Sequence, residues 1–146
     1  MFSAGILPYD GEHFLLGKQN GGWTTFSGKS KAGETPNDTA IREFAEETAG
    51  VFPEIDIAGV QPLVTHTPRG FAFYLFCVRV PRNPEHSTAF LHRRSLTLSP
   101  DYREMQQVAW IHVADLERTP LRTAFRVDLP KILSIIEKAA VVTVER

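Results

Sequence analysis

The chain has 146 residues, of which 42% are hydrophobic and 23% are charged, an ordinary composition for a globular protein. This length predicts a single domain over residues 1–146, large enough to bury a core without disulfides. A formal net charge of −1 excludes a strong overall attraction to nucleic acid or to acidic membranes. A site for a polyanion would therefore be local, or built around bound cations.

The sequence holds one cysteine, Cys77, so an internal disulfide is excluded. It lies in the apolar stretch Phe71–Val80, where we expect a small buried thiol. The longest apolar run is far shorter than the about 20 residues that span a bilayer, and no basic region with a long apolar run follows the first residue. We expect no membrane segment and no signal peptide, and a cytoplasmic, reducing compartment is compatible with the single thiol.

The first part of the chain predicts a β-hairpin, because Asp10-Gly11 supplies the positive φ that a tight turn needs. The expected order is a strand at Phe2–Tyr9, the turn, a strand at His13–Lys18, a loop at Gln19–Gly22, a strand at Trp23–Phe26 and a loop at Ser27–Gly33.

The clearest predicted element is a helix at Pro36–Thr48. Thr35 is the expected N-cap, and a proline at the first helical position costs no hydrogen bond. Gly50 is placed to end the helix. Helical spacing predicts one buried face, formed by Ile41, Phe44, Ala45 and Thr48.

The second half of the chain predicts further strands and a long helix. The expected elements are strands at Ile55–Thr65, Phe71–Val80 and Val108–Val113, a turn or short helix at Asp115–Arg118, and a helix at Pro120–Lys138. Pro130 predicts a kink in that helix, or two shorter helices. Thr88–Leu98 is a candidate strand, although its basic triplet His92-Arg93-Arg94 argues against this. Strands and helices mixed in this irregular order favour an α+β fold or α/β/α layers.

Three carboxylates of the predicted helix carry the main chemical signal. Glu43, Glu46 and Glu47 stand at i, i+3 and i+4, which places them on one face within a single turn. Their charges repel, and a cation would relieve the repulsion; carboxylate oxygens suit hard ions such as Mg²⁺ or Mn²⁺. Taken alone, these three residues are better explained as a solvated acidic helix face.

The wider spacing favours the metal interpretation. Five residues separate Gly28 from Glu34, and seven more precede the run Arg42-Glu43-Phe44-Ala45-Glu46-Glu47. Six specified positions at roughly one in fifteen each would coincide by chance on the order of once in ten million windows. This segment resembles the Nudix box, the signature of the Nudix hydrolase family.

The resemblance covers most of the chain, including the early hairpin, the segment Trp23–Lys29 that enters the box and the later segment Glu104–Leu116. It weakens over residues 81–100 and over the last helix. Two positions depart from the family pattern. Ser27 stands where a glycine is usual, and at the end of the box either the helix is one residue longer or Ala49 replaces a glycine.

The resemblance implies a Nudix-type α/β/α sandwich with a mixed sheet, and a role for each residue of the box. Glu43 and Glu47 would be the main ligands of Mg²⁺ or Mn²⁺, with Glu46 beside them and the backbone carbonyl of Ser27 as a further ligand. Glu34 and Arg42 would pair and hold the loop against the helix, unless they form only an ordinary surface salt bridge.

The general base and the phosphate contacts stay open at this stage. Glu43, Glu46 and Glu104 are the candidates for the base, since members of the family differ in this choice. Gly28 begins the box, and Lys29 and Arg42 are candidates for phosphate contact, although Lys29 is as well explained as a solvated cation. Four aromatic residues could stack on a base but are more often core residues: Trp23, Phe26, Phe73 and Tyr74.

The expected reaction is attack of water on a diphosphate bond in a nucleotide-like substrate, with a nucleoside triphosphate pyrophosphatase as the leading form. Alternatives are capped RNA, which the triplet His92–Arg94 could contact, and a nucleotide sugar such as ADP-ribose. Pro62 and Pro68 bracket the position of a proline found in ADP-ribose enzymes without matching it. A binding module without turnover is the alternative from another class, and a homodimer is possible because relatives are often dimers.

Overall fold

The structure is a computed structural model that describes residues 1–51, 55–96 and 105–144, with the backbone alone from residue 138 onward. Within these residues, seven strands form one sheet in the order β3-β2-β1-β6-β5, with β4 paired to β1 and β7 paired to β2. The strands are β1 (Ser3–Tyr9), β2 (His13–Gln19), β3 (Gly22–Thr24), β4 (Phe26–Lys29), β5 (Leu63–His66), β6 (Ala72–Arg79) and β7 (Gln107–His112). The sheet is mixed, because β1 and β6 are parallel while the other pairs are antiparallel.

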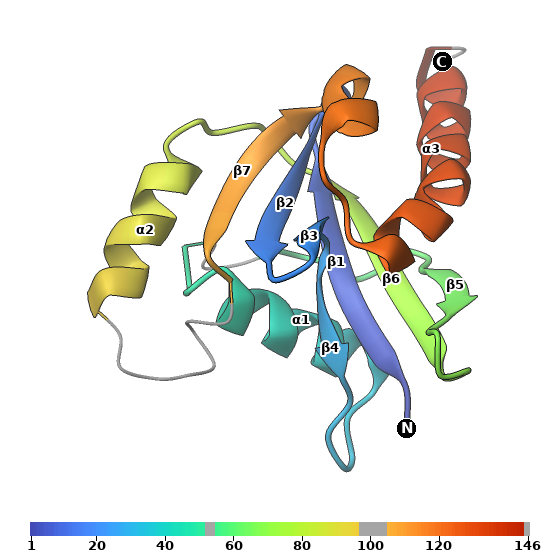
Figure 1. Ribbon diagram of the computed structural model, residues 1–146. Helices are drawn as coiled ribbons and strands as arrows, with labels where there is room; N and C mark the ends of the chain where they lie inside the picture. Colours follow the sequence, from blue (N-terminus) through green and yellow to red (C-terminus); the bar gives the residue numbers. More distant parts are fainter. Residues whose placement is uncertain (52–54, 97–104, 145–146) are drawn as a thin grey trace.

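Helices cover both faces of this sheet (Figure 1). They are α1 (Pro36–Glu47), α2 (His86–Leu96) and α3 (Thr123–Val144), with a short 3-10 helix, η2 (Val113–Arg118), before α3. Neighbouring strand residues point to opposite faces, so that Ile6 belongs to the core under α1 and α2, whereas Leu7 belongs to the core under α3. The expected α+β class and the α/β/α layers are confirmed.

Each core layer joins helix residues to the sheet. On one face Phe44 of α1 meets Phe26 edge to face, with ring centroids 5.3 Å apart, and Phe90 of α2 is fully buried in the same cluster. On the other face Phe125 and Ile132 of α3 pack into the second cluster. In the described part of the chain no helix is long and apolar enough to cross a membrane.

Three expectations about the strands are corrected. The predicted strand Trp23–Phe26 is two strands, β3 and β4, separated at Thr25. The predicted loop Ser27–Gly33 is wrong in its first part, because Ser27 to Lys29 belong to β4 and pair with β1 in the register Gly5↔Ser27. Of the predicted strand Ile55–Thr65, the described residues form only β5, near its end.

Two helical regions also differ from expectation. The candidate strand Thr88–Leu98 is wrong, since His86–Leu96 is the helix α2, whose Arg93 and Arg94 lie in the last turn, where cations complement the helix dipole. At Pro130 the alternative of two shorter helices is wrong, because α3 is a single helix with the proline inside it. The ribbon of α3 changes direction in its first half, in line with the other alternative, a kink (Figure 1).

The end of α1 shows which explanation holds for the second departure from the family pattern, a longer helix or Ala49 in place of a glycine. The helix is no longer than expected: it ends at Glu47, with Thr48 as its C-cap. Ala49 follows with φ of 55°, and Gly50 with φ of 72°. Ala49 thus occupies a left-handed position that a glycine would adopt at lower cost.

Candidate active site

The helix α1 begins with a capping box that fixes the start of the acidic segment. The Asp38 N–H donates to Thr35 Oγ1 at 3.2 Å, and the Thr35 N–H donates to Asp38 Oδ2 at 3.1 Å. The face that α1 buries differs from the predicted one, because Ile41 is 49% exposed while Glu43 and Glu47 are buried beside Phe44. Two of the three carboxylates are therefore drawn into the interface between α1 and the sheet.

Glu43 lies directly against β4. Its residue is 9% exposed, and a Cβ atom placed on Gly28 would overlap its carboxylate group. Gly28 is therefore required for steric reasons, because the absence of a side chain lets the carboxylate approach the strand backbone. This is the closest structural link between the first residue of the box and its acidic run.

Arg42 connects the loop before α1 to the carboxylates. Its Nε and Nη2 donate to the two oxygens of Glu34 at 2.7 and 2.9 Å, a bidentate pair. Its Nη1 donates to Glu43 Oε1 at 2.9 Å and lies 3.4 Å from Glu46 Oε2, and its Nη2 also donates to the Lys29 carbonyl at 3.0 Å. The expected contact between Glu34 and Arg42 is present, and it extends into a wider network.

This network has an electrostatic consequence at Glu34. Hydrogen bonds from Arg42 and from the Lys31 backbone, with a further one from Thr39, lower the pKa of Glu34 from 4.5 to about 2. The hydrogen bonds that Arg42 makes with Glu34 and with Glu43 raise the pKa of Arg42 above its ordinary value. Both groups keep their charges throughout the physiological pH range, and Arg42 remains a permanent cation beside Glu43 and Glu46.

Glu47 has a different environment from the other two carboxylates. Its residue is 1% exposed, and its Oε2 accepts a hydrogen bond from Gln19 Nε2 at 3.0 Å. The oxygen of that amide, Gln19 Oε1, accepts a hydrogen bond from Arg122 Nη1 at 2.6 Å. Sequence reasoning missed both Gln19 and Arg122, which are 28 and 75 positions from Glu47 in the chain.

The oxygen donors of α1 fit a hard divalent cation. Within the described residues, no group of three or more His, Cys, Asp and Glu side chains, the predicted set of Glu43, Glu46 and Glu47 included, is arranged so that it could hold a metal ion. Mg²⁺ does not require such a group, since it commonly takes one or two carboxylates and completes its shell with water and substrate phosphates. The space that Gly28 leaves for the Glu43 carboxylate supports the same fit.

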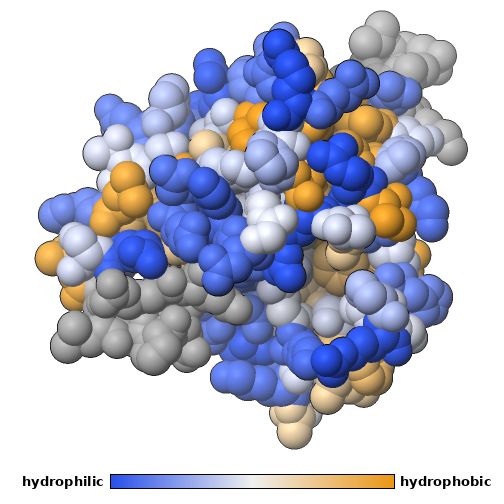
Figure 2. Space-filling model, in the orientation of Figure 1, coloured by the Kyte–Doolittle hydropathy of each residue, from blue (hydrophilic) through white to orange (hydrophobic). Residues whose placement is uncertain are grey.

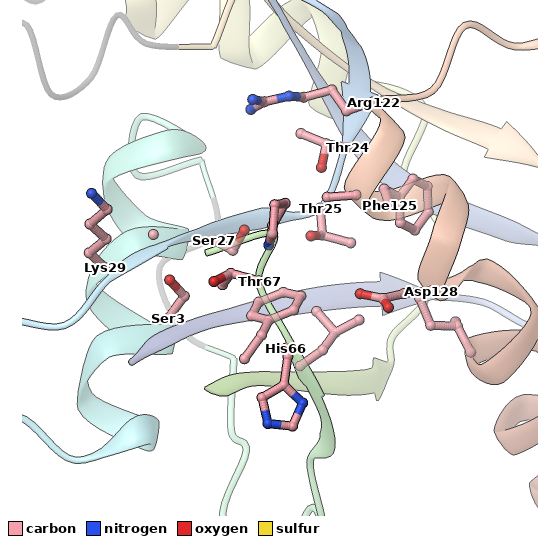
Figure 3. Close-up of a pocket in the computed structure, with 16 residues that line it drawn as sticks. Ser3, Thr24, Thr25, Ser27, Lys29, His66, Thr67, Arg122, Phe125 and Asp128 are labelled. Carbon is pink, nitrogen blue, oxygen red and sulfur yellow. The ribbon is translucent and has the colours of Figure 1, made fainter. Parts of the chain in front are cut away.

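A cavity of about 350 Å³ lies between β4 and the start of α3, and Gly28, which adjoins the Glu43 carboxylate, is one of the residues that line it. Ser27, Gly28 and Lys29 form one of its walls, and Asp128 and Phe125 of α3 form another (Figure 3). The face of the molecule seen in Figure 1 is largely hydrophilic, with hydrophobic residues near α3 (Figure 2). Cavities of 300 Å³ or more accept small organic ligands.

Inside the cavity, Asp128 is the charged group with the least solvent contact. Its residue is 8% exposed, and its Oδ2 accepts a hydrogen bond from Thr65 Oγ1 at 3.2 Å. The carboxylate points from α3 toward the centre of the view in Figure 3. Arg122 and Lys29 stand at the periphery of the same view. The cavity thus combines an interior acceptor with cations at its border.

The candidates that remain are the four aromatic residues, the possible base Glu104 and the basic triplet. Among the aromatic residues, Phe73 lines the cavity, whereas Phe26 is fully buried in the core and Tyr74 packs edge to face on Phe2. Trp23 lies outside the lining of that cavity. Glu104, a candidate base, lies outside the described residues.

The basic triplet is partly engaged in holding the fold together. Arg93 Nε donates to the Ala49 carbonyl at 3.3 Å, and Arg94 Nε donates to the Met105 carbonyl at 2.8 Å. These two arginines connect α2 to the end of α1 and to the segment before β7. Their contacts are those of structural residues.

Comparison with known proteins agrees with this geometry. The family model described as the NUDIX domain matches residues 1–132. A search of curated proteins found no match. Among solved structures, a MutT from work on Aliivibrio salmonicida and Vibrio cholerae is similar with a TM-score of 0.59 and 16% identity, over 93% of this chain and 95% of that one.

Two further structures share the fold. The Ap4A hydrolase of C. elegans has a TM-score of 0.59 and 20% identity over 99% of both chains. The NUDIX domain of Shewanella oneidensis NrtR, solved with ADP ribose, has a TM-score of 0.57 and 18% identity, over 96% of this chain and 86% of that one. With the family model covering residues 1–132, and Glu43 of the box lying against Gly28 of β4, this protein belongs to the Nudix family of pyrophosphohydrolases.

Proposed function

We propose that the chain hydrolyses a diphosphate bond of a nucleoside triphosphate in the presence of Mg²⁺ or Mn²⁺, releasing a nucleoside monophosphate and pyrophosphate. The observation that carries this proposal is the position of Gly28. It lines the cavity and at the same time contacts the Glu43 carboxylate. A nucleoside held in the cavity would therefore have its phosphates beside the acidic face of α1.

The chemistry assigns distinct tasks to the residues of α1. Glu43, Glu46 and Glu47, with the Ser27 carbonyl, would hold the metal. A bound divalent cation would neutralise phosphate oxygens and lower the pKa of the attacking water. One of Glu43, Glu46 and Glu104 would accept the proton of that water as the new bond to phosphorus forms and the bond to the leaving phosphate breaks.

The cavity supports a nucleoside as the recognised part of the substrate. Phe73 and Phe125 offer aromatic surface on which a base can pack, and the Asp128 carboxylate can accept hydrogen bonds from the amino or imino groups of a base. Lys29 and Arg122 supply positive charge at the border, where phosphates would leave the cavity. This combination favours a nucleotide over a simple inorganic polyphosphate.

The test is nucleoside monophosphate release from a panel of nucleoside triphosphates, ADP-ribose, dinucleoside polyphosphates and capped RNA, with Mg²⁺ or Mn²⁺. We expect turnover by the wild type and at least a hundredfold loss in Glu47→Gln. Glu117→Gln is the matched control, because it removes the same charge at an exposed position in η2.

Three outcomes bear on the proposal. Preferred turnover of a triphosphate, lost only in Glu47→Gln, supports it. Preference for ADP-ribose or capped RNA would replace the substrate and keep the reaction. Binding of a nucleotide without turnover by any variant would establish a non-catalytic module and refute the enzymatic proposal.

The base-binding part of the cavity has its own test in Asp128→Leu. This variant should raise KM about tenfold for nucleotides whose base donates a hydrogen bond to Asp128, the effect of losing one hydrogen bond to a charged group. The order of preference among the bases should change accordingly. The variant should leave Mn²⁺ affinity unchanged, because Asp128 is on α3 and the proposed metal ligands are on α1 and β4. An unchanged ranking would exclude Asp128 from base recognition.

A further inference from the structure

A hydrogen-bonded chain of three side chains crosses from the border of the cavity to α1. Arg122 Nη1 donates to Gln19 Oε1 at 2.6 Å, and Gln19 Nε2 donates to Glu47 Oε2 at 3.0 Å. The second distance falls within the ordinary range for an N–H···O hydrogen bond, and the first is shorter, in the direction expected for a charged donor. The chain joins three elements that are remote in sequence: the end of β2, the start of α3 and the last turn of α1.

The two contacts define the orientation of the Gln19 amide. A glutamine side chain has an acceptor at one end and a donor at the other, so only one of its two orientations serves both neighbours. The cation Arg122 can meet only the carbonyl oxygen, which turns the NH₂ group toward Glu47. Arg122 therefore selects the orientation in which Gln19 is a donor to the carboxylate.

The backbone around Arg122 is held in place independently of its side chain. The Arg122 N–H donates to the Trp23 carbonyl at 2.9 Å, and the Trp23 N–H donates to the Pro120 carbonyl at 2.8 Å. Gly22, with φ of 124°, allows this approach, since a Cβ at that position would lie 2.6 Å from the Pro120 carbonyl oxygen. The turn between β2 and β3 thus packs on the segment before α3, and the backbone of Arg122 is held in a fixed position.

Burial makes the orientation of Glu47 dependent on such a partner. The residue is 1% exposed, so water has little access to it. A buried carboxylate requires hydrogen bonds to remain charged, and the donor that supplies one also restricts its rotamer. In metal sites, groups that orient the ligands in this way contribute substantially to affinity.

We propose that Gln19 is a positioning residue that orients the Glu47 carboxylate for the divalent cation, and that Arg122 acts on the site by holding the Gln19 amide in its donor orientation. The inference rests on the proposed function, because it takes Glu47 as a metal ligand. It adds to that function two residues outside the Nudix box and a physical connection between the cavity border and the metal site.

The experiment measures Mn²⁺ binding to the protein without nucleotide, by electron paramagnetic resonance titration, for wild type, Gln19→Met, Arg122→Met and the double variant. Methionine keeps the length of the glutamine side chain and removes both hydrogen bonds. We expect Gln19→Met to weaken Mn²⁺ binding by about 10-fold to 100-fold. Arg122→Met should weaken it by a smaller factor, and should add nothing to the effect in the Gln19→Met background.

Turnover supplies a second readout that general destabilisation would not reproduce. At low Mn²⁺ the Gln19→Met protein should show a reduced kcat with KM for nucleotide changed by less than about threefold, and excess Mn²⁺ should restore kcat. Gln107→Leu is the matched control, since it removes an amide from β7 at the position paired with Lys18, next to Gln19. Thermal unfolding of each variant identifies any that fails to fold, and Gln19→Leu is then the replacement.

The outcomes separate the inference from the function on which it rests. If the wild type neither binds Mn²⁺ nor turns over any nucleotide, the proposed function fails. If the wild type does both and Gln19→Met binds Mn²⁺ with unchanged affinity, the function stands and the role of Gln19 is overturned. If Arg122→Met weakens Mn²⁺ binding equally in both backgrounds, Arg122 does not act through Gln19.

Discussion

Two glycines that lie close together in the sheet should respond in opposite ways to the same substitution. Gly5 of β1 and Gly28 of β4 occupy paired strands, and neither has room for a methyl group. At Gly5 the added Cβ would overlap the Phe26 carbonyl oxygen and the Cα and Cβ of Ser27, whereas at Gly28 the three nearest atoms all belong to the Glu43 carboxylate. Gly5→Ala therefore tests the fold, and Gly28→Ala tests the active site.

The magnitudes follow from what must move. Backbone in a paired strand cannot shift freely, so Gly5→Ala should cost about 3 kcal/mol, the upper end for overpacking. For a domain of this size that corresponds to a Tm lower by about 10 °C. At Gly28 the obstacle is the end of a side chain, which can rotate away. Gly28→Ala should therefore change stability by less than about 1 kcal/mol, since alanine also restricts the unfolded chain.

The effects on activity should follow the opposite order, with Gly28→Ala impaired more than Gly5→Ala. In Gly28→Ala the Glu43 carboxylate carbon must move from 2.2 Å to at least 3.4 Å from the added Cβ, a shift of more than 1 Å. A displacement of about 1 Å already costs about 100-fold in rate. Thermal unfolding, Mn²⁺ titration and nucleotide turnover are measured for both variants. Full turnover and unchanged Mn²⁺ affinity in Gly28→Ala would refute the argument that Gly28 is required for the placement of Glu43. An unchanged Tm in Gly5→Ala would refute the steric reasoning itself.

Three further predictions concern charges and hydrogen bonds. Arg42 lowers the pKa of Glu34 to about 2, so Glu34 stabilises the fold above pH 4.5 and this contribution is lost as the pH falls from 4.5 through 2. The stability difference between wild type and Glu34→Gln in urea unfolding should therefore shrink over that interval, and a constant difference would contradict the assignment. Thr65→Val removes the donor to Asp128 and should lower the free energy of unfolding by about 1–2 kcal/mol, checked by urea unfolding. Arg42→Gln should destabilise the metal-free protein by about 2 kcal/mol. Added Mn²⁺ should then raise the Tm of Arg42→Gln by more than it raises the Tm of the wild type. An equal rise in both proteins would argue against the idea that Arg42 and the metal ion neutralise the same carboxylates.

The helix α1 shows what sequence patterns can predict. Its start depends on local chemistry, namely the N-cap Thr35 and the proline that follows, and the structure has the predicted cap. The end of the helix is also local, with Ala49 and Gly50 in left-handed conformations. The resemblance to the Nudix box implied the Glu34–Arg42 contact, and the structure has it.

The errors occur where tertiary packing overrides local preference. In α2 only Phe90 is buried, so the helix has no apolar stripe that would mark it in the sequence. The strand β4 contains serine, glycine and lysine, which are typical of loops, and it exists because β1 supplies its hydrogen-bond partners. The buried face of α1 was predicted from apolar residues alone, but Ile41 is exposed and two glutamates take its place.

The cavity could not be predicted for a related reason. Its walls come from strands near the N-terminus and from α3, and Arg122 meets Gln19 across 103 positions in the chain. A glutamine at the end of a strand and an arginine before a helix have no distinguishing pattern. Only the register of β2 with its neighbours and the docking of the turn at Gly22 bring them together.

The arrangement of charge explains how three adjacent acids are tolerated in a folded helix. The repulsion expected among them is reduced without a metal ion, because Arg42 lies against Glu43 and Glu46 while Glu47 is held by a neutral amide. Arg42 is in turn fixed by Glu34, which keeps the guanidinium close to the helix. A divalent cation would compete with Arg42 for the carboxylates of Glu43 and Glu46. The fold can therefore form before the metal arrives, which suits an ion that completes its shell with substrate phosphates.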